Sequence, residues 1–276
     1  MTLKILCRTT TQTHAFKCAE QMRLGLKRHG LGIEIKSGND FSLRADVHLI
    51  WGWHNERLIK SIMSRGERVL VMERAYVDDR FKWTSLGWDG LNGNADFCNR
   101  GMPSDRWNKH FAEHMSAEWH HRDSGYVLIM GQVSTDAAVK PFKIGSWYSS
   151  VALRAKELGA QAVFRRHPKG AINSGSSLKT LHGSMESALA GARCVVTYNS
   201  NSGVLAVLAG VPTIAVNSGS MVYDLVDHHF SLNPSTPDRT QWAHNIAYAQ
   251  WLPEEISSGE AWAHIRMGLE HRERVA

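Results

Sequence analysis

The sequence lacks any apolar run long enough to cross a membrane. A spanning helix needs about 18 to 20 consecutive apolar residues, and no stretch of the 276 residues approaches that length. Residues 1–8 are too short and too polar for a signal peptide and are typical of a first strand. Low-complexity tracts are also absent, which argues against a disordered or fibrous chain. We therefore expect a folded, cytoplasmic protein.

Cysteine is scarce, and its spacing excludes the common metal sites. The four cysteines lie far apart in the sequence, so we expect reduced thiols rather than a disulfide framework or a zinc site. His110 and His114 are spaced to share one face of a helix, but no third ligand is evident. The sequence therefore predicts no bound metal.

Neither charge is gathered into runs, yet the chain is basic. The 32 Lys and Arg residues against 26 Asp and Glu give a formal net charge of +6 and a pI of about 9.2. This balance favours a phosphate-bearing or polyanionic partner, although a modestly basic surface without such a partner fits equally well. The ten tryptophans are many for this length. Most belong in a core, and some could stack on a sugar or a base.

Residues 193–216 are the most informative stretch of the chain. The pattern is strand, polar turn, helix and second strand, with Gly210 and Pro212 ending the helix. A helix N-terminus carries free N–H groups and a positive dipole, so the turn could bind a diphosphate. Alternatively, the Ser and Asn side chains of the turn could cap the helix without binding a ligand. The candidate binding residues of this turn are Thr197, Asn199, Ser200, Ser202 and Gly203.

Two other strands of the second half also end in polar residues. The strand at 126–130 is followed by Gly131 and Gln132, and the strand at 162–165 leads directly into Arg166, His167 and Lys169. In parallel sheets, ligands bind outside the carboxyl ends of the strands. An imidazole flanked by two cations at that edge is suited to a phosphate or a carboxylate.

The first half likewise alternates strands with helices. Strands are expected at 3–7, 33–35, 45–52 and 69–73, with helices at 14–29 and 56–65. This alternation indicates a parallel sheet with right-handed crossovers. The stretch 77–96 is rich in Gly, Asn, Asp and Trp. We expect it to be an irregular active-site or acceptor loop, because long structured loops usually carry function.

The motifs of the second half resemble those of GT-B glycosyltransferases. The Gly-Gln strand end, the His-Pro segment at 167–168 and the stretch from Ser200 to Pro212 are similar to segments of two groups. These are the capsule-polysaccharide and Kdo-type transferases and the UDP-N-acetylglucosamine 2-epimerases. One position departs from the pattern, because Leu205 stands where these families carry an acidic residue that often holds the donor ribose. Segments 73–76, 83–94, 250–251 and 259–262 are more loosely similar to phage-encoded glycosyltransferases.

The resemblance implies an α/β fold of two Rossmann-like parallel-sheet domains facing a cleft, with C-terminal helices. The expected parts are an acceptor-side domain at 1–122, a nucleotide-sugar domain at 123–245 and a helical tail at 246–276 that packs back on the first domain. The implied reaction moves a sugar from a nucleotide-sugar, expected to be a UDP-sugar, to an acceptor hydroxyl without a metal or cofactor. The phage-type likeness favours a hydroxymethylated pyrimidine in DNA as the acceptor, in the cytoplasm of a host cell.

Each step of such a reaction has candidate residues. The donor diphosphate is expected to be held, and stabilised as it leaves, by the 197–203 turn together with Gln132, Arg166, His167 and Lys169. The general base is expected among Asp79, Asp78 and Glu73, with His54 as a further candidate. The acceptor is expected to contact Arg74, Arg80, Lys82, Trp83, Trp88 and His54, with DNA phosphates on the cations and a base on tryptophan. A base inside a duplex would have to be flipped out.

Three alternatives remain open at the level of sequence. A transferase acting on a capsule or lipid-linked sugar would use the same donor motifs. A sugar-nucleotide epimerase would also use them, but needs several carboxylates and no second substrate. A non-catalytic protein that binds nucleotides or nucleic acid would keep the basic residues and tolerate loss of Asp78, Asp79 and Glu73.

Overall fold

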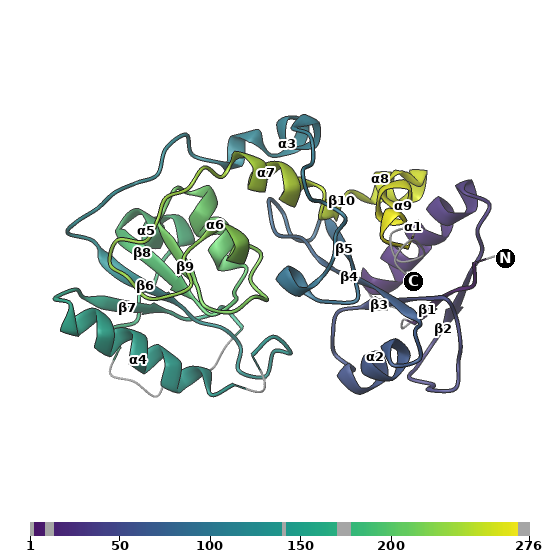
Figure 1. The fold of residues 1–276 in the computed structure, drawn as a ribbon, viewed down its shortest axis with the longest axis horizontal. Helices are drawn as coiled ribbons and strands as arrows, with labels where there is room; N and C mark the ends of the chain where they lie inside the picture. Colours follow the sequence, from purple (N-terminus) through teal and green to yellow (C-terminus); the bar gives the residue numbers. More distant parts are fainter. Residues whose placement is uncertain (1–2, 9–13, 140–141, 170–177, 270–276) are drawn as a thin grey trace. The chain divides into compact units, whose positions relative to one another are not determined.

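The computed structural model describes residues 3–8, 14–139, 142–169 and 178–269. The chain divides into two compact units, each with its own sheet (Figure 1). The first unit combines the residues up to His110 with those from Gln241 onward, and the second is Phe111–Thr240. The boundaries between the units thus lie at 110/111 and 240/241, whereas the boundaries predicted from the sequence follow residues 122 and 245.

The first unit contains a six-stranded sheet with the order β10-β5-β4-β3-β1-β2. Its strands are β1 (Ile5–Arg8), β2 (Ile33–Lys36), β3 (Val47–Trp51), β4 (Arg68–Arg74), β5 (Thr84–Trp88) and β10 (Gln250–Trp251). The first four are parallel, whereas β5 pairs antiparallel with both β4 and β10. The carboxyl ends of β1 to β4 therefore share one edge, where a parallel sheet binds its ligands.

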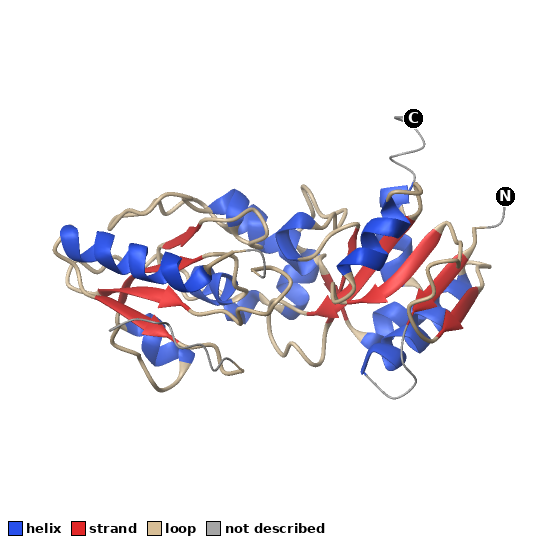
Figure 2. Cartoon of the chain, turned by 90° about the horizontal axis from the view of Figure 1, so that it is seen from below, coloured by secondary structure: helices blue, strands red, loops and turns tan. Residues whose placement is uncertain are grey.

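Helices cover both faces of this first sheet (Figure 2). On one face lie α1 (His14–Arg28), α8 (Pro253–Ser258) and α9 (Glu260–Ile265), and on the other lies α2 (Glu56–Met63). A β-carbon on Gly25 of α1 would lie 2.0 Å from the carbonyl oxygen of Ile256 in α8. Only glycine allows these two helices to pack so closely, so the C-terminal segment is part of the first core.

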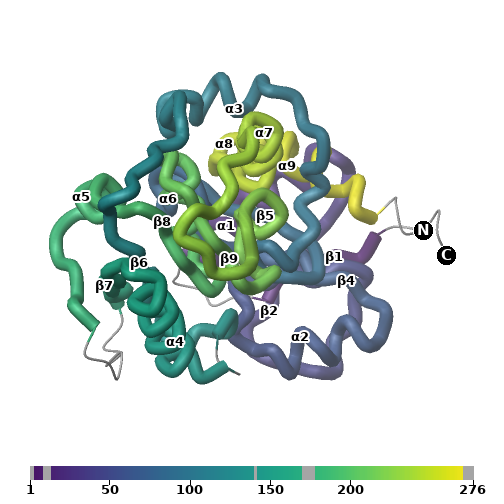
Figure 3. The backbone as a smooth tube through the Cα atoms, turned by 60° about the vertical axis from the view of Figure 1, so that its left-hand side comes forward, coloured from purple at the N-terminus to yellow at the C-terminus, as the bar shows by residue number. Residues whose placement is uncertain are grey.

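The second unit is a smaller sheet of four parallel strands with the order β7-β6-β8-β9 (Figure 3). Its strands are β6 (Tyr126–Met130), β7 (Ala162–Arg165), β8 (Ala192–Thr197) and β9 (Thr213–Ala215). Helix α4 (Ile144–Glu157) covers one face, whereas α5 (Met185–Ala190) and α6 (Ser202–Leu208) cover the other. Both faces of the strands are buried, as the continuous apolar runs in their sequences predict. The predicted class, α/β with two Rossmann-like parallel sheets, is confirmed.

Short helices complete the two units. They are η1 (Asn92–Asn94), α3 (Asp105–His110), η2 (Ala112–His114), η3 (Tyr223–Leu225) and α7 (Thr240–Ala247). In the part of the chain that the structure describes, no helix is both long enough and apolar enough to span a membrane.

The expectation of an irregular loop at 77–96 is wrong. The middle of this stretch is β5, whose five residues are buried between β4 and β10. Its glycine is required by packing, because a β-carbon on Gly87 would lie 2.7 Å from the side chains of Ala95 and Phe97. Asp89 and Asn92 have positive φ values of 52° and 51° and make the turn that follows. The glycine and asparagine that suggested a loop therefore serve a tightly packed strand and its turn.

Candidate functional site

Polar residues follow every strand of the second sheet at its carboxyl end. Gln132 follows β6, Arg166 and His167 follow β7, Asn199 follows β8 and Asn217 follows β9. Because the four strands are parallel neighbours, these residues lie along one edge of the sheet. The fold thus gathers at this edge the candidate donor-binding residues that the sequence places after three separate strands.

Hydrogen bonds between side-chain amides connect the strand ends at this edge. The Gln132 Nε2 donates to Asn199 Oδ1 at 2.6 Å, and the Asn199 backbone N–H donates to Gln132 Oε1 at 3.1 Å. Asn199 Nδ2 in turn donates to Asn217 Oδ1 at 3.0 Å. Gln132 and Asn199 are 7% and 3% exposed. Their side chains therefore hold the ends of β6, β8 and β9 in place, and Asn217, which the sequence analysis does not name as a site residue, joins them.

The turn before α6 is also organised by its own side chains. Thr197 Oγ1 accepts from the Ser200 backbone N–H at 2.9 Å, and Ser200 Oγ accepts from the Ser202 backbone N–H at 3.2 Å. A β-carbon on Gly203 would lie 3.2 Å from methyl groups of Thr197 and Val222. These hydroxyls fix the turn after β8, in the way that capping residues do.

The cationic residues expected at this edge lie at its surface. Arg166 and Lys169 are exposed, and His167 is half-buried. The His167 Nδ1 accepts a hydrogen bond from the Lys169 backbone N–H at 3.1 Å. Because Nδ1 accepts, the proton of the neutral ring is on Nε2, which makes Nε2 a hydrogen-bond donor. Two cations and a donor on one short segment suit an anion.

Two aromatic residues beside this edge are not among those expected from the sequence. The rings of Phe142 and Tyr198 are stacked, with centroids 4.7 Å apart and planes 10° from parallel. Tyr198 directly follows β8, so its position in the polar turn was a usable signal, but only the fold brings Phe142 to it. Leu205, at the position that is acidic in the families of the resemblance, is 40% exposed on α6.

In the first unit, an imidazole and a carboxylate converge beside a glycine. Gly52 follows β3 with a positive φ of 66°. A β-carbon placed on it would lie 2.9 Å from His54 Nε2 and 3.2 Å from Glu73 Oε2. Both groups therefore approach one point at the carboxyl edge of β3 and β4, and glycine leaves that point open. Either an imidazole or a carboxylate at such a point can act as a general base.

The two aspartates that the sequence analysis prefers as the base are engaged in a turn. Asp78 has a positive φ of 63°, and its Oδ2 accepts from Trp83 Nε1 at 3.0 Å. Asp79 Oδ1 accepts from the Phe81 backbone N–H at 2.8 Å. Both side chains shape the segment between β4 and β5, although both residues are exposed.

The assignment of Trp83 and Trp88 to base stacking is corrected by their burial. Each is 1% exposed, so neither ring offers a face to a ligand. The Trp88 Nε1 donates to the Ile265 carbonyl at 2.7 Å and joins β5 to α9. The neighbouring cations Arg80 and Lys82 are exposed, as an acceptor contact requires.

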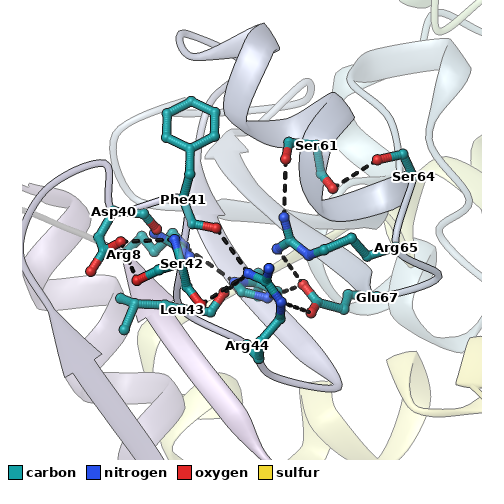
Figure 4. Close-up of polar contacts among 11 residues, drawn as sticks. Arg8, Asp40, Phe41, Ser42, Leu43, Arg44, Ser61, Ser64, Arg65 and Glu67 are labelled. Atoms are coloured by element: carbon teal, nitrogen blue, oxygen red, sulfur yellow. Dashed lines mark hydrogen bonds and ion pairs between the residues drawn. The ribbon is translucent and has the colours of Figure 1, made fainter.

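A buried polar network lies on the α2 face of the same sheet (Figure 4). His48 is 0% exposed, and its Nδ1 accepts from Arg8 Nε at 3.2 Å. Its Nε2 must therefore donate to Glu67 Oε2, 2.9 Å away. Burial and the charge of Arg8 lower the pKa of His48, so the ring is neutral. Arg65 also donates to Glu67, and Arg44 donates to carbonyls of residues 41–43. The network anchors the loop between β2 and β3.

Burial sets the protonation of three cysteine thiols. Burial raises the pKa of Cys7, Cys98 and Cys194 to about 12, which keeps these thiols protonated. Among the described residues, no group of three or more His, Cys, Asp or Glu side chains is placed to hold a metal ion.

Comparisons with known proteins identify the fold. The sequence matches no family model, and no curated protein matches it. Among solved structures, the KpsC β-Kdo 2,7 transferase of Thermosulfurimonas dismutans has a TM-score of 0.52 at 13% identity, covering 94% of this chain and 99% of its own. The KpsC β-Kdo 2,4 transferase of the same organism has a TM-score of 0.59 at 10% identity, covering 91% and 92%. The chain therefore has a GT-B-like fold.

Proposed function

We propose that the chain is a glycosyltransferase that moves a sugar from a nucleotide-sugar to an acceptor hydroxyl. The observation that carries the proposal is the carboxyl edge of the second sheet. There Arg166, His167 and Lys169 lie along the same edge as the Gln132–Asn199 amide pair, within a GT-B-like fold. A fold alone does not define an activity, and the activity follows from what these side chains can bind and stabilise.

In the proposed reaction the second unit binds the donor, a UDP-sugar. Arg166 and Lys169 neutralise the diphosphate, and His167 donates a hydrogen bond from Nε2. The same groups stabilise the negative charge that builds on the diphosphate as it leaves, so the step as proposed needs no metal. The stacked Phe142 and Tyr198 offer an aromatic surface for the nucleobase.

The first unit supplies the base. As the acceptor oxygen bonds to the anomeric carbon, the bond from that carbon to the diphosphate oxygen breaks, and the electron pair leaves with the nucleotide. The acceptor proton passes to His54 or Glu73, whose side chains both approach the point that Gly52 leaves open. We favour this pair over Asp78 and Asp79, whose carboxylates already accept hydrogen bonds that shape a turn.

For the acceptor, we propose a hydroxymethylated pyrimidine in DNA. With Trp83 and Trp88 buried, this proposal now depends on the exposed sequence Arg80-Phe81-Lys82, in which Phe81 is 61% exposed. An aromatic ring between two cations suits a base and its phosphates. A second candidate acceptor is a capsule-type sugar, and the similarity to two Kdo transferases supports it.

A thermal-shift panel of nucleoside diphosphates and nucleotide-sugars tests the donor site. At about 100 times its dissociation constant, a ligand adds roughly 2.7 kcal/mol of stability. We expect a shift with one nucleotide that His167→Ala abolishes. His121→Ala is the matched control, because His121 is exposed in the same unit but precedes β6. If no nucleotide shifts the melting temperature, the chain is not a transferase of this kind. Transfer of a labelled sugar to hydroxymethylated DNA or to an oligosaccharide then separates the two acceptors.

A further inference from the structure

Arg74 carries a positive charge that the described part of the chain leaves unpaired. It ends β4 and is half-buried, with its guanidinium carbon 4.1 Å from the centroid of the Phe81 ring. Its Nη1 is buried and has no hydrogen-bond partner. No carboxylate or carbonyl of the described residues accepts a hydrogen bond from this guanidinium, and the adjacent Glu73 accepts only from the Arg74 backbone N–H. A buried donor without an acceptor is destabilising, and more so when it is charged.

Arg68, on the same strand, is a structural arginine whose hydrogen bonds can be compared with those of Arg74. It is also half-buried and also lies over an aromatic ring, that of Trp88 at 4.9 Å. Its Nε, however, pairs with the Asp89 carboxylate, and its Nη1 donates to the Gly268 carbonyl at 2.9 Å. Residues 68 and 74 have the same orientation on the strand, because side chains of a strand alternate between its faces. The two arginines therefore differ chiefly in that Arg74 lacks an acceptor.

The groups around Arg74 are neutral hydrogen-bonding side chains. Thr84 is its cross-strand partner, and Thr84 Oγ1 lies 3.3 Å from Cys18 Sγ. Cys18 Sγ is in turn 3.6 Å from His14 Nε2 in the first turn of α1, which contains no acidic residue. Desolvation, then the charges of Arg74 and Lys17, lower the pKa of His14, so its ring is neutral at pH 7. A cation among neutral donors, without a carboxylate among them, is complementary to an anion.

We propose that Arg74 is a binding residue for an anionic group, a carboxylate or a phosphate, with Thr84 and His14 as its neutral neighbours. This inference rests on the proposed function in one respect, namely that the anionic group belongs to the acceptor. Arg74 follows Glu73 directly, so the anion site and the proposed base lie at the same end of β4, on opposite faces of the strand. The planar guanidinium can bind either anion through two parallel hydrogen bonds.

The first experiment compares the stability of Arg74→Met and Arg68→Met in the absence of ligand. Methionine keeps an apolar chain against the aromatic ring but removes the charge. We expect Arg74→Met to melt at or above the temperature of the wild type, because an unpaired, partly buried charge has been removed. Arg68→Met should melt at a lower temperature, because it leaves Asp89 without its partner. A loss in Arg74→Met equal to that in Arg68→Met would show that Arg74 is structural and would overturn the proposal.

The second experiment titrates the protein with inorganic phosphate and with glucuronate, at ionic strength held constant with sodium chloride. We expect at least one of them to raise the melting temperature of the wild type, with roughly ten- to hundredfold weaker binding in Arg74→Met, as expected for loss of a charge-assisted pair. Arg23→Met, at an exposed arginine on α1 of the same unit, should bind like the wild type. Phosphate alone would indicate a phosphate-bearing acceptor, and glucuronate alone a sugar acid. Equal binding by Arg74→Met and the wild type would refute the assignment.

The same variants separate this inference from the proposed function. Any phosphate effect that His167→Ala removes belongs to the second unit and does not count toward Arg74. If Arg74→Met loses the anion while no nucleotide binds the wild type, the anion site stands and the transferase proposal fails. If nucleotides bind and sugar transfer proceeds, Arg74→Met should raise the KM for the acceptor and leave that for the donor unchanged.

Discussion

The ion pair of Arg106 and Glu255 should be among the most sensitive points of the first unit. Arg106 Nη1 and Nη2 donate to the two carboxylate oxygens of Glu255 at 2.7 and 3.0 Å. The side chains are only 6% and 8% exposed. Arg106 also donates to the carbonyls of Ala247 and Gln250, and its guanidinium lies 4.0 Å from the Trp251 ring centroid. This one side chain therefore joins α3 to the C-terminal segment.

Replacing Arg106 by methionine should cost about 3–5 kcal/mol, because the change leaves a buried carboxylate without its partner. Burial alone would raise the pKa of Glu255, but the hydrogen bonds from Arg106 and Leu252 outweigh burial and lower it. The variant keeps the hydrogen bond from Leu252 but loses those from Arg106, so the carboxylate should become easier to protonate. The double variant Arg106→Met/Glu255→Leu removes both charges and should recover much of the loss.

Urea unfolding followed by tryptophan fluorescence measures this effect in the right unit, because only Trp119 and Trp147 of the ten tryptophans lie outside it. Arg154→Met is a suitable control, since Arg154 pairs with Glu157 on the surface of α4, where ion pairs contribute at most about 1 kcal/mol. Two results would refute the reasoning: a loss below about 1 kcal/mol in Arg106→Met, or a double variant as unstable as the sum of the two single variants.

Three further predictions follow from buried contacts. Burial and the charge of Arg8 lower the pKa of His48 in the folded state, whereas the unfolded chain binds a proton below a pH of about 6.5. The free energy of unfolding should thus fall as the pH is lowered from 7 to 5. His48→Gln should make this fall smaller in urea titrations, and an unchanged dependence on pH would contradict the assignment. Gly131→Ala should cost about 1–3 kcal/mol, because its β-carbon would lie 2.8 Å from the Arg165 carbonyl oxygen, and a normal melting curve would count against this packing. Gln132→Ala leaves two buried groups of Asn199 without their partners, so it should lower the free energy of unfolding by about 1–3 kcal/mol. It should also reduce the shift in melting temperature that a nucleotide causes. Gln241→Ala, at an exposed site, should change neither quantity.

The C-terminal segment contributes both to the stability of the first unit and to the shape of its candidate site. Gln250 of β10 accepts from the backbone N–H groups of Tyr76 and Val77 at 2.9 and 3.0 Å, directly after β4. Residues from the end of the chain thus fix the segment that follows the proposed base and the proposed anion site. A variant that loosens α8 should therefore affect the first unit's site as well as its stability.

The sequence by itself determined most strands and helices of the two sheets, with the exceptions of β5 and β10, and the polar residues that follow the strands of the second sheet. Apolar runs such as 126–130 and 194–196 are buried on both faces, and polar residues such as Gln132 and His167 follow the strands directly. These are local properties, because a parallel strand between helices must be apolar throughout and must end where polar residues begin.

Only the tertiary structure decided which polar and aromatic residues are available for function. Asp78, Asp79, Trp83 and Trp88 have the composition of a site, but their partners lie in the segment between β4 and β5 or in α9. Conversely, two features depend on contacts between separate strands and helices: the approach of His54 and Glu73 to Gly52, and the guanidinium of Arg74, for which the described residues offer no acceptor. Burial and hydrogen bonding are set by residues distant in the sequence. The residue types alone therefore could not show which side chains are buried or hydrogen-bonded within the fold and which are available to a ligand.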